Sequence, residues 1–414
     1  MSAAELLGLI AAAVLLQVIV GIAVSVWRRR GAPRPLPADA SGDARAGAGA
    51  AWSGWREFRV ASRVFEDSAK TQCSFYLQPV DGRPLPTFRP GQFLTFSLDV
   101  AAEAEARSSA TRTITRCYSL SDRPDPSHYR VTVKRVSAPA AHPEFAPGLS
   151  SNHFHDHVQA GDLLRVKAPA GGFFIDPDAE VAAVLIAGGI GITPLMSMLR
   201  WCIVQQPLRK VHLYYGLRHT GEMAFRPLLV ELAAAHPALR LNIVCSRPEA
   251  AEVCGRDYQH EGHIDVGLLQ RTLPPGRHQF YVCGPPPMMQ TLVPALSAWG
   301  VPPADLHYEA FGPASVKLPA GNEAAAPAIG GVEVRFRRSG RTLNWEGQDA
   351  SLLDFAERHG IAVESGCRAG SCGSCETLLV EGSVRYDHAP DHEVAAGHCL
   401  LCVGRPSSAL VLEA

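Results

Sequence analysis

The cysteines near the C-terminus have a spacing that indicates a definite chemistry. Cys367, Cys372 and Cys375 form a C-x4-C-x2-C run, and Cys399 and Cys402 follow further along the chain. This spacing is typical of a [2Fe–2S] cluster held by four thiolates. A loop that supplies three of these ligands must wrap closely around the cluster, so it needs small residues that give its backbone conformational freedom. Those residues are Gly366, Gly370, Ser371, Gly373 and Ser374.

Zinc sites and structural thiols are the alternatives to a cluster at such cysteines. We expect the cluster, because three ligands come from one tight loop with the C-x4-C-x2-C spacing. Spacing alone leaves the fourth ligand open between Cys399 and Cys402. The chain has 11 cysteines in 414 residues, which is too few for a disulfide scaffold. A cluster loop near solvent also suits a reducing compartment.

The N-terminus carries an apolar run from Leu6 to Trp27 that is interrupted only by small residues and Gln17. As a helix it is long enough for a hydrocarbon core of about 30 Å. Three arginines, 28–30, follow the run, whereas a cleavable signal peptide carries its positive charge before it. The positive-inside rule places the rest of the chain in the cytoplasm. The sequence predicts a single-pass anchor in the inner (cytoplasmic) membrane over residues 1–30, in contact with lipid, and a flexible tether over residues 31–51; a buried core helix is the alternative.

Short strand-like runs separated by turn residues occupy the next part of the chain. They suggest a small antiparallel β-barrel, which we place at residues 52–177. Within it, residues 116–120 read Arg-Cys-Tyr-Ser-Leu on a strand, and residues 148–152 read Gly-Leu-Ser-Ser-Asn at the opening of a helix. Three histidines, His153, His155 and His157, follow. We do not expect them to bind a metal, because residues two apart do not share a helix face.

A buried-strand run at residues 181–187 leads into a glycine-rich turn and a helix. This combination forms an anion site suited to a dinucleotide pyrophosphate, although its glycine pattern differs from G-x-G-x-x-G. Further strand runs end at Tyr215, Cys245 and Cys283. We expect an α/β Rossmann-like domain with a parallel sheet over residues 178–312, with its ligand at the carboxyl ends of the strands. The turn contributes Gly188, Gly189, Gly191, Thr193 and Pro194.

The order and company of these segments resemble the ferredoxin–NADP reductase superfamily, and residues 147–198 resemble especially the reductase half of flavohaemoglobins. The resemblance implies that Arg116 faces the pyrophosphate of FAD, that Tyr118 packs on the isoalloxazine, and that Ser119 approaches the ring where hydride arrives. Arginine suits phosphate because its charge is permanent and its donors are arranged as a fork. The helix opening offers free N–H groups to the same anion, which implicates Gly148, Ser151 and Asn152.

The same resemblance extends into the nucleotide domain. It places the turn formed by Cys283 and Gly284 against the nicotinamide, and it implies that Glu309 or Phe311 borders the flavin. Ser119, Cys283 and Glu309 are therefore the candidate catalytic residues.

The segment that follows the strand ending at Cys245 contains four residues that bear on the choice between NADH and NADPH. Plant-type reductases hold the 2′-phosphate with a Ser-Arg pair and a later basic-x-Tyr, which correspond here to Ser246, Arg247, Arg256 and Tyr258. Flavohaemoglobin-like reductases share the Gly-Arg-Asp-Tyr stretch, and many of them prefer NADH. Arg247 departs from the NADH-type pattern, so the sequence favours NADPH while leaving both donors open.

The C-terminal segment Gly397–Pro406 resembles the end of plant-type ferredoxins, and that resemblance selects Cys402 as the fourth ligand. Val332, Val334 and Phe336 alternate as in a strand, and residues 351–359 read as a short capped helix. We expect a β-grasp ferredoxin domain over residues 331–414, joined by a linker at residues 313–330. The domain order is similar to that of phthalate-dioxygenase-type reductases. Those use FMN, but the adenine-side residues here favour FAD.

Together these features predict a multidomain, membrane-anchored reductase that passes electrons from NAD(P)H through FAD and a [2Fe–2S] cluster to a protein acceptor. An integral-membrane oxygenase, hydroxylase or desaturase would suit the anchor. An electron carrier or redox sensor with a non-functional nucleotide site is the alternative. Two other interpretations fit the sequence less well. A subunit of a sodium-pumping quinone reductase has its ferredoxin before the flavin domain, whereas here the ferredoxin follows, and a nitric oxide dioxygenase needs a globin domain, which we do not find in this sequence. The formal net charge of −1, without a basic stripe, argues against a nucleic-acid partner.

Overall fold

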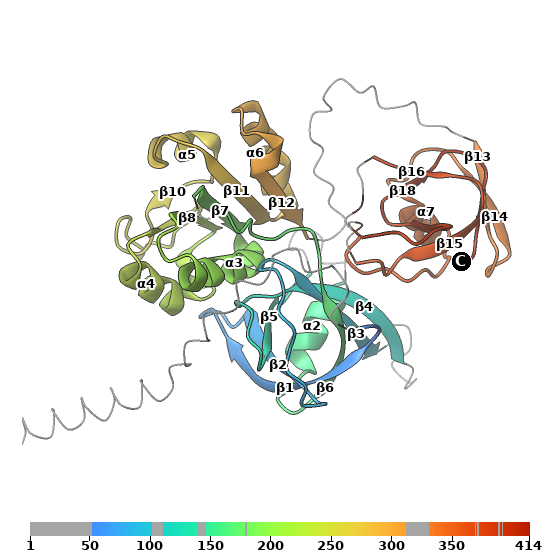
Figure 1. Cartoon of the computed structure of the whole chain (residues 1–414), viewed down its shortest axis with the longest axis horizontal. Coiled ribbons are helices and arrows are strands. Elements are labelled where there is room, and N and C mark those ends of the chain that lie inside the picture. The colour runs from blue at the N-terminus through green and yellow to red at the C-terminus, as the bar shows by residue number, and fades with distance from the viewer. Residues whose placement is uncertain are drawn as a thin grey trace, which may run out of the picture. The chain divides into compact units, whose positions relative to one another are not determined.

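The computed structural model describes residues 52–101, 111–138, 146–178, 180–311, 331–368, 370, 372–387, 390 and 392–414. The predicted anchor at residues 1–30, the tether at 31–51 and the linker at 313–330 lie outside this part of the chain. Among the helices that the structure does describe, none is both long and apolar enough to span a bilayer. Three domains follow one another along the described sequence (Figure 1).

The first domain is a six-stranded antiparallel sheet with strand order β4-β3-β6-β1-β2-β5. An antiparallel bridge between Leu120, just after β4, and Val131 of β5 joins the two edges, as in a small barrel. The helix α2 (Leu149–Asp156) packs Phe154 edge-on against Phe75 and Phe96 of the strands. The predicted barrel is therefore confirmed. The strands are β1 (Arg56–Phe65), β2 (Gln72–Pro79), β3 (Phe93–Ala101), β4 (Thr111–Ser119), β5 (Tyr129–Lys134) and β6 (Leu163–Ala170).

The second domain is a parallel sheet with strand order β10-β9-β8-β7-β11-β12. Helices α3 (Ile192–Gln205) and α4 (Arg226–Ala235) cover one face, and α5 (Val266–Thr272) and α6 (Pro286–Ala298) cover the other (Figure 1). The strands are β7 (Ala182–Gly188), β8 (Val211–Leu217), β9 (Leu239–Cys245), β10 (His260–Glu261), β11 (His278–Gly284) and β12 (Leu306–Ala310).

This sheet is doubly wound, as the sequence predicts. The chain runs outward from β7 through β8 and β9, then returns to the other side of β7 with β11. The strand order therefore reverses between β7 and β11, and ligands of open α/β sheets bind at the carboxyl ends of the strands at such a reversal. Both glycine-bearing turns singled out in the sequence leave these two strands.

The third domain has a five-stranded mixed sheet, β14-β13-β19-β15-β17, and a small β16-β18 pair. In the middle β13 runs parallel to β19, and α7 (Leu352–Arg358) packs Phe355 against Phe336 and Trp345. The helix begins where the sequence predicts, because the Ser351 hydroxyl accepts a hydrogen bond from the Asp354 N–H. The strands are β13 (Val332–Phe336), β14 (Arg341–Trp345), β15 (Glu376–Glu381), β16 (Val384–Tyr386), β17 (His398–Leu400), β18 (Gly404–Pro406) and β19 (Leu410–Leu412).

Candidate functional site

The end of β4 carries the predicted flavin residues. Pairing with β3 sets Ser119 opposite Phe93 and Tyr118 opposite Leu94. The Tyr118 ring meets the Phe154 ring edge-on at a centroid distance of 5.0 Å, and its hydroxyl shares a 2.7 Å hydrogen bond with the hydroxyl of Ser150. Burial raises the pKa of Tyr118 to about 12, so this phenol stays neutral at physiological pH. The tyrosine is thus held rigidly between the strand and α2.

Arg116 fits the role of a phosphate-binding cation. Its guanidinium is half-buried and donates one hydrogen bond, of 2.7 Å, to the Thr115 carbonyl. No carboxylate forms an ion pair with it among the residues that the structure describes. Burial lowers the pKa of this guanidinium, which is the cost of a cation kept partly out of water. A phosphate would compensate for that cost and engage the remaining donors.

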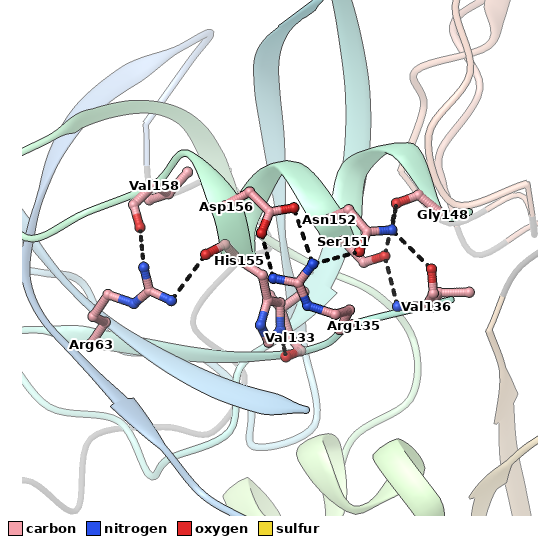
Figure 2. A network of polar contacts seen from close by, with 10 residues as sticks. All are labelled: Arg63, Val133, Arg135, Val136, Gly148, Ser151, Asn152, His155, Asp156 and Val158. Atoms are coloured by element: carbon pink, nitrogen blue, oxygen red, sulfur yellow. Dashed lines mark hydrogen bonds and ion pairs between the residues drawn. The ribbon is translucent and has the colours of Figure 1, made fainter. Parts of the chain in front are cut away.

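The start of α2 is shaped by a network of polar contacts (Figure 2). The Asn152 amide donates to the carbonyls of Val136 (2.9 Å) and Gly148 (2.8 Å). The Ser151 hydroxyl donates to the Gly148 carbonyl and accepts from the Val136 N–H. No side chain caps the first turn of the helix, and it holds no acidic residue. The side chains of Ser151 and Asn152 thus orient the helix, which leaves its N-terminus suited to an anion.

The other end of α2 is fixed in the same network (Figure 2). The Arg63 guanidinium donates to the carbonyls of Val158 and His155, and Arg135 forms an ion pair with Asp156. The buried His155 ring is hydrogen-bonded through Nε2 to the Val133 carbonyl at 2.9 Å. This histidine therefore serves the barrel framework.

At the reversal point of the second domain, two turns pack backbone against backbone. A Cβ atom built on Gly191 would lie 2.5 Å from the Cys283 carbonyl carbon and 2.8 Å from the Gly284 nitrogen. A Cβ on Gly188 would lie 3.3 Å from the Gly284 Cα and 2.6 Å from the Met288 sulfur. These glycines are required because there is no space for a side chain. The structure therefore brings the predicted pyrophosphate turn and the predicted nicotinamide turn into direct contact.

The α3 N-terminus follows this turn and is also left uncapped by side chains and free of acidic residues. The Thr193 hydroxyl donates to the Ile190 carbonyl at 3.0 Å, and its side chain is buried. Pro194 lies in the first turn, where its missing N–H breaks no helical hydrogen bond. The hydroxyl of Thr193 thus shapes the loop, while the backbone N–H groups and helix dipole remain for a pyrophosphate.

Cys283 is the penultimate residue of β11, fully buried and opposite Glu309 of β12 in register. Burial, and secondarily the charge of Glu309, raise the pKa of the Cys283 thiol well above its ordinary value. This thiol is therefore neutral at physiological pH and suited to contact and positioning rather than nucleophilic attack. The half-buried Phe311 packs against the cluster of buried hydrophobic residues to which Cys283 belongs.

The four residues predicted to select the nucleotide lie in different environments. Arg256 is exposed and forms an ion pair with Asp257 at 2.7 Å, whereas Tyr258 is only 4% exposed and packs in the core. The Ser246 hydroxyl donates to the Leu217 carbonyl. Arg247 is exposed, and in the described part of the chain it has no ion-pair partner. Of the four side chains, only the Arg247 guanidinium is both exposed and uncommitted.

The cysteines of the third domain approach one another in twos. The Cys367 N–H donates to the Cys372 sulfur at 3.2 Å, and the Cys402 N–H donates to the Cys375 sulfur at 3.5 Å. Hydrogen bonding from the Cys402 thiol lowers the pKa of Cys375. Among the described residues no three metal-binding side chains converge on one point. Thiols gathered in twos fit a group with two irons and four thiolate ligands.

Cys399 and Cys402 form a second C-x2-C pair in addition to Cys372 and Cys375, so the cluster is favoured by the C-x4-C-x2-C run and not by the number of C-x2-C pairs. Their environments differ. Cys399 is buried in the β17 strand, opposite Thr377, and burial raises the pKa of its thiol to about 12. Cys402 instead lies against Cys375. This difference supports the prediction that Cys402 is the fourth ligand.

Two residues that support the sites escaped sequence reasoning. Ser150 binds the Tyr118 hydroxyl, and Arg368 forms ion pairs with Glu357 and Asp354 on α7 while its own backbone takes a φ of +57°. Arg368 thus attaches the cysteine loop to the helix. Its position between two cysteines was a signal, but its partners belong to a separate element. Ser150 lies beside the predicted Ser151, and only the fold shows which serine faces the tyrosine.

Comparison with known proteins agrees with this geometry. Residues 185–293 match the model of the oxidoreductase NAD-binding domain, and residues 334–407 match that of the 2Fe-2S iron-sulfur cluster binding domain. The flavohemoprotein of Halalkalibacterium halodurans is 36% identical over 263 residues, which are 63% of this chain and 61% of that protein. The chain therefore spans about three fifths of the length of that curated relative.

Two solved structures resemble the chain over different shares of its length. The flavohem-like FAD/NAD binding domain of nitric oxide dioxygenase from Vibrio cholerae is 30% identical with a TM-score of 0.53, and the match covers 62% of this chain and 98% of that one. Phthalate dioxygenase reductase, described as a modular structure for electron transfer from pyridine nucleotides to [2Fe–2S], is 27% identical with a TM-score of 0.52. That match covers 87% of this chain and 98% of the reductase.

Proposed function

This chain belongs to the ferredoxin–NADP reductase superfamily, with a [2Fe–2S] domain at its C-terminal end, and we propose that it is the membrane-anchored reductase component of an oxygenase-type system. Its general activity is that of an NAD(P)H-dependent reductase with FAD and [2Fe–2S] electron transfer. The observation that carries the proposal is that one chain combines three features. They are a barrel whose α2 N-terminus and Arg116 suit an anion, an α/β sheet whose strand order reverses at two glycine-bearing turns, and four cysteines that approach one another in two pairs. Phthalate dioxygenase reductase matches across all three.

The residues of each site have separate tasks. A bound flavin would supply the chemistry that converts a two-electron hydride from NAD(P)H into single electrons for the iron–sulfur group. In this proposal Arg116 and the α2 N-terminus hold the flavin phosphate, which the lack of an acidic partner at either one in the described part of the chain supports, and the hydrogen bond with Ser150 orients Tyr118. The buried, neutral Cys283 contributes shape to the nicotinamide side of the turn.

The proposed donor is NADPH. Support comes from Arg247, whose exposed guanidinium is uncommitted, while Arg256 is already paired with Asp257. A 2′-phosphate carries nearly two negative charges and would gain a charge-assisted hydrogen bond from Arg247. We expect Arg247→Ala to raise the KM for NADPH far more than the KM for NADH. Equal small effects on both nucleotides would contradict this assignment, and Arg256→Ala is the matched control.

The proposed location is the cytoplasmic face of the inner membrane. Support comes from the apolar run between Leu6 and Trp27 and the three arginines that follow it. Removal of residues 1–51 is expected to move the protein from the membrane fraction to the supernatant while leaving its absorption spectrum unchanged. Recovery of the full-length protein in the supernatant would exclude the anchor.

The proposed acceptor is an oxygenase, hydroxylase or desaturase, and the anchor favours one that is itself in the membrane. A substitute acceptor tests the electron route before the physiological partner is known. Cytochrome c stands in for a protein acceptor, and ferricyanide for a small oxidant that reacts with the reduced flavin directly. Cys372→Ser is expected to abolish most NAD(P)H-dependent cytochrome c reduction while ferricyanide reduction persists. Unchanged cytochrome c reduction without the cluster would contradict the proposal.

A further inference from the structure

The loop that carries Pro390 and residues 392–395 lies against the cysteine run at two points. A Cβ built on Gly370 would lie 3.1 Å from Pro390, and a Cβ on Gly373 would lie 2.5 Å from Nε2 of His392. The imidazole of His392 therefore rests directly on the Gly373 backbone, between the predicted ligands Cys372 and Cys375. Gly373 has a φ of +68°, so both its backbone conformation and the overlying ring exclude a side chain there.

Three hydrogen bonds fasten this covering loop. His392 Nε2 donates to Glu376 Oε2 at 2.8 Å, and the His392 backbone N–H donates to the Gly370 carbonyl at 3.0 Å. The other oxygen of the Glu376 carboxylate accepts from the Ala395 N–H at 2.7 Å. His392 is thus hydrogen-bonded to Gly370 within the cysteine run and to Glu376, which directly follows Cys375 at the start of β15.

The position of this ring matters because the cysteine run acts through its backbone as well as its sulfurs. N–H groups such as that of Cys367 point at thiol sulfur. Hydrogen bonds to the sulfurs and exposure to solvent tune the reduction potential of an iron–sulfur group. The His392 side chain is 31% exposed and that of Glu376 is 20% exposed, so the pair forms a partly buried cover rather than a free surface contact.

We propose that His392 is a positioning residue for the [2Fe–2S] group: hydrogen-bonded to Glu376 and stacked on Gly373, it holds the cysteine run in its binding conformation and limits the access of water. This inference rests on the proposed function, since it concerns how this chain keeps its electron-transfer group. No part of it requires His392 to bind iron.

The test uses the full-length protein with His392→Ala, His392→Gln and a control, His359→Ala. Glutamine keeps an N–H donor that can reach Glu376. His359 is a half-buried histidine of the same domain whose ring packs on Phe355 instead of the cysteine run. The measurements are the rate of cluster loss under anaerobic chelation, the visible circular dichroism of the cluster and its reduction potential. Bleaching of the flavin by NADPH is recorded for every protein.

We expect His392→Ala to lose the cluster on the order of 10-fold faster than the wild type, because outer partners of metal ligands commonly contribute that much to metal retention. Its dichroism and potential should also change. His392→Gln should restore most of the retention and the spectrum, and His359→Ala should match the wild type.

Wild-type retention, spectrum and potential in His392→Ala would overturn the inference. So would equal effects from His392→Ala and His359→Ala, or a failure of His392→Gln to recover any cluster that the alanine variant loses. A wild-type protein without cluster absorption would instead overturn the proposed function, and normal flavin bleaching in all variants separates the two failures.

Discussion

Gly191 in the glycine-rich turn of the nucleotide domain and Gly370 and Gly373 in the cysteine run of the ferredoxin domain are all required, but for different physical reasons. Gly191 has a helical φ of −59°, which any residue adopts, but its Cα faces the Cys283–Gly284 backbone without room for a Cβ. Gly370 and Gly373 have φ values of +77° and +68°, which disfavour other residues whatever the space. Gly191 is thus constrained by the close approach of two strand ends, whereas Gly370 and Gly373 are constrained by their own backbone conformation and by the side chains around them.

The largest effect is expected in the ferredoxin domain, from replacing one of the predicted cysteine ligands. Cys402→Ser should remove nearly all iron and the visible absorption of the cluster, because the group needs four thiolates. Cys399→Ser is the matched control, being a buried thiol of the same domain that is not placed against Cys375. Iron analysis and absorption spectra decide. Loss of the cluster in Cys399→Ser with retention in Cys402→Ser would reverse the assignment.

The next largest effect is expected in the nucleotide domain, where a side chain at Gly191 would overlap the facing backbone. Gly191→Ala should slow NAD(P)H-driven flavin reduction on the order of 100-fold, since small displacements of bound reactants have effects of that size. Overpacking should also lower the free energy of unfolding by about 2 kcal/mol. Stopped-flow kinetics and denaturation measure the two. Gly267→Ala in α5 is the control, because its new methyl would meet side-chain atoms and no backbone: Arg271 at 3.3 Å and Asp265 at 3.4 Å. Equal rates in both variants would show that the turn tolerates a side chain.

A third prediction separates backbone conformation from contact within the ferredoxin domain. Gly360 and Gly373 share a φ of +68°, but a Cβ on Gly360 meets nothing within 4 Å, whereas one on Gly373 meets His392. Both alanine variants should lose about 1 kcal/mol of stability through the backbone. Only Gly373→Ala should also lose the cluster faster, on the order of 10-fold. Equal rates of cluster loss would mean that the His392 contact has no role.

The smallest expected effect concerns acid sensitivity of the nucleotide domain. Burial, with the neighbouring His278, lowers the pKa of His212 to about 4, below its ordinary value of 6.5. Between these values the unfolded chain binds a proton that the folded domain excludes, so this contribution is complete above pH 6.5 and falls as pH drops toward 4. The free energy of unfolding should fall by about 0.7 kcal/mol between pH 7 and pH 6. Thermal unfolding of His212→Gln should show a weaker dependence, and an unchanged pH profile would exclude His212 as its source.

Local patterns in the sequence were enough to predict the barrel strands, the strands of the parallel sheet, the capped α7 and the cysteine loop, because each depends on residues close together in the chain. The contact of Gly191 with Cys283 was not predictable, since it arises only when β7 and β11 become neighbours. The same holds for Ser150 on Tyr118 and for His392 on Gly373. For Tyr258 the motif predicts a nucleotide contact, and the fold adds that this side chain is buried, which the sequence did not indicate.

The most direct test of the central claim is an anaerobic titration of the purified protein with NADPH and, separately, with NADH, with the flavin and cluster absorption bands followed together. We expect the flavin to bleach first and the cluster to follow, with NADPH clearly faster than NADH. A flavin that stays oxidised with both nucleotides, while dithionite reduces the cluster, would contradict the reductase assignment and leave an electron carrier in its place.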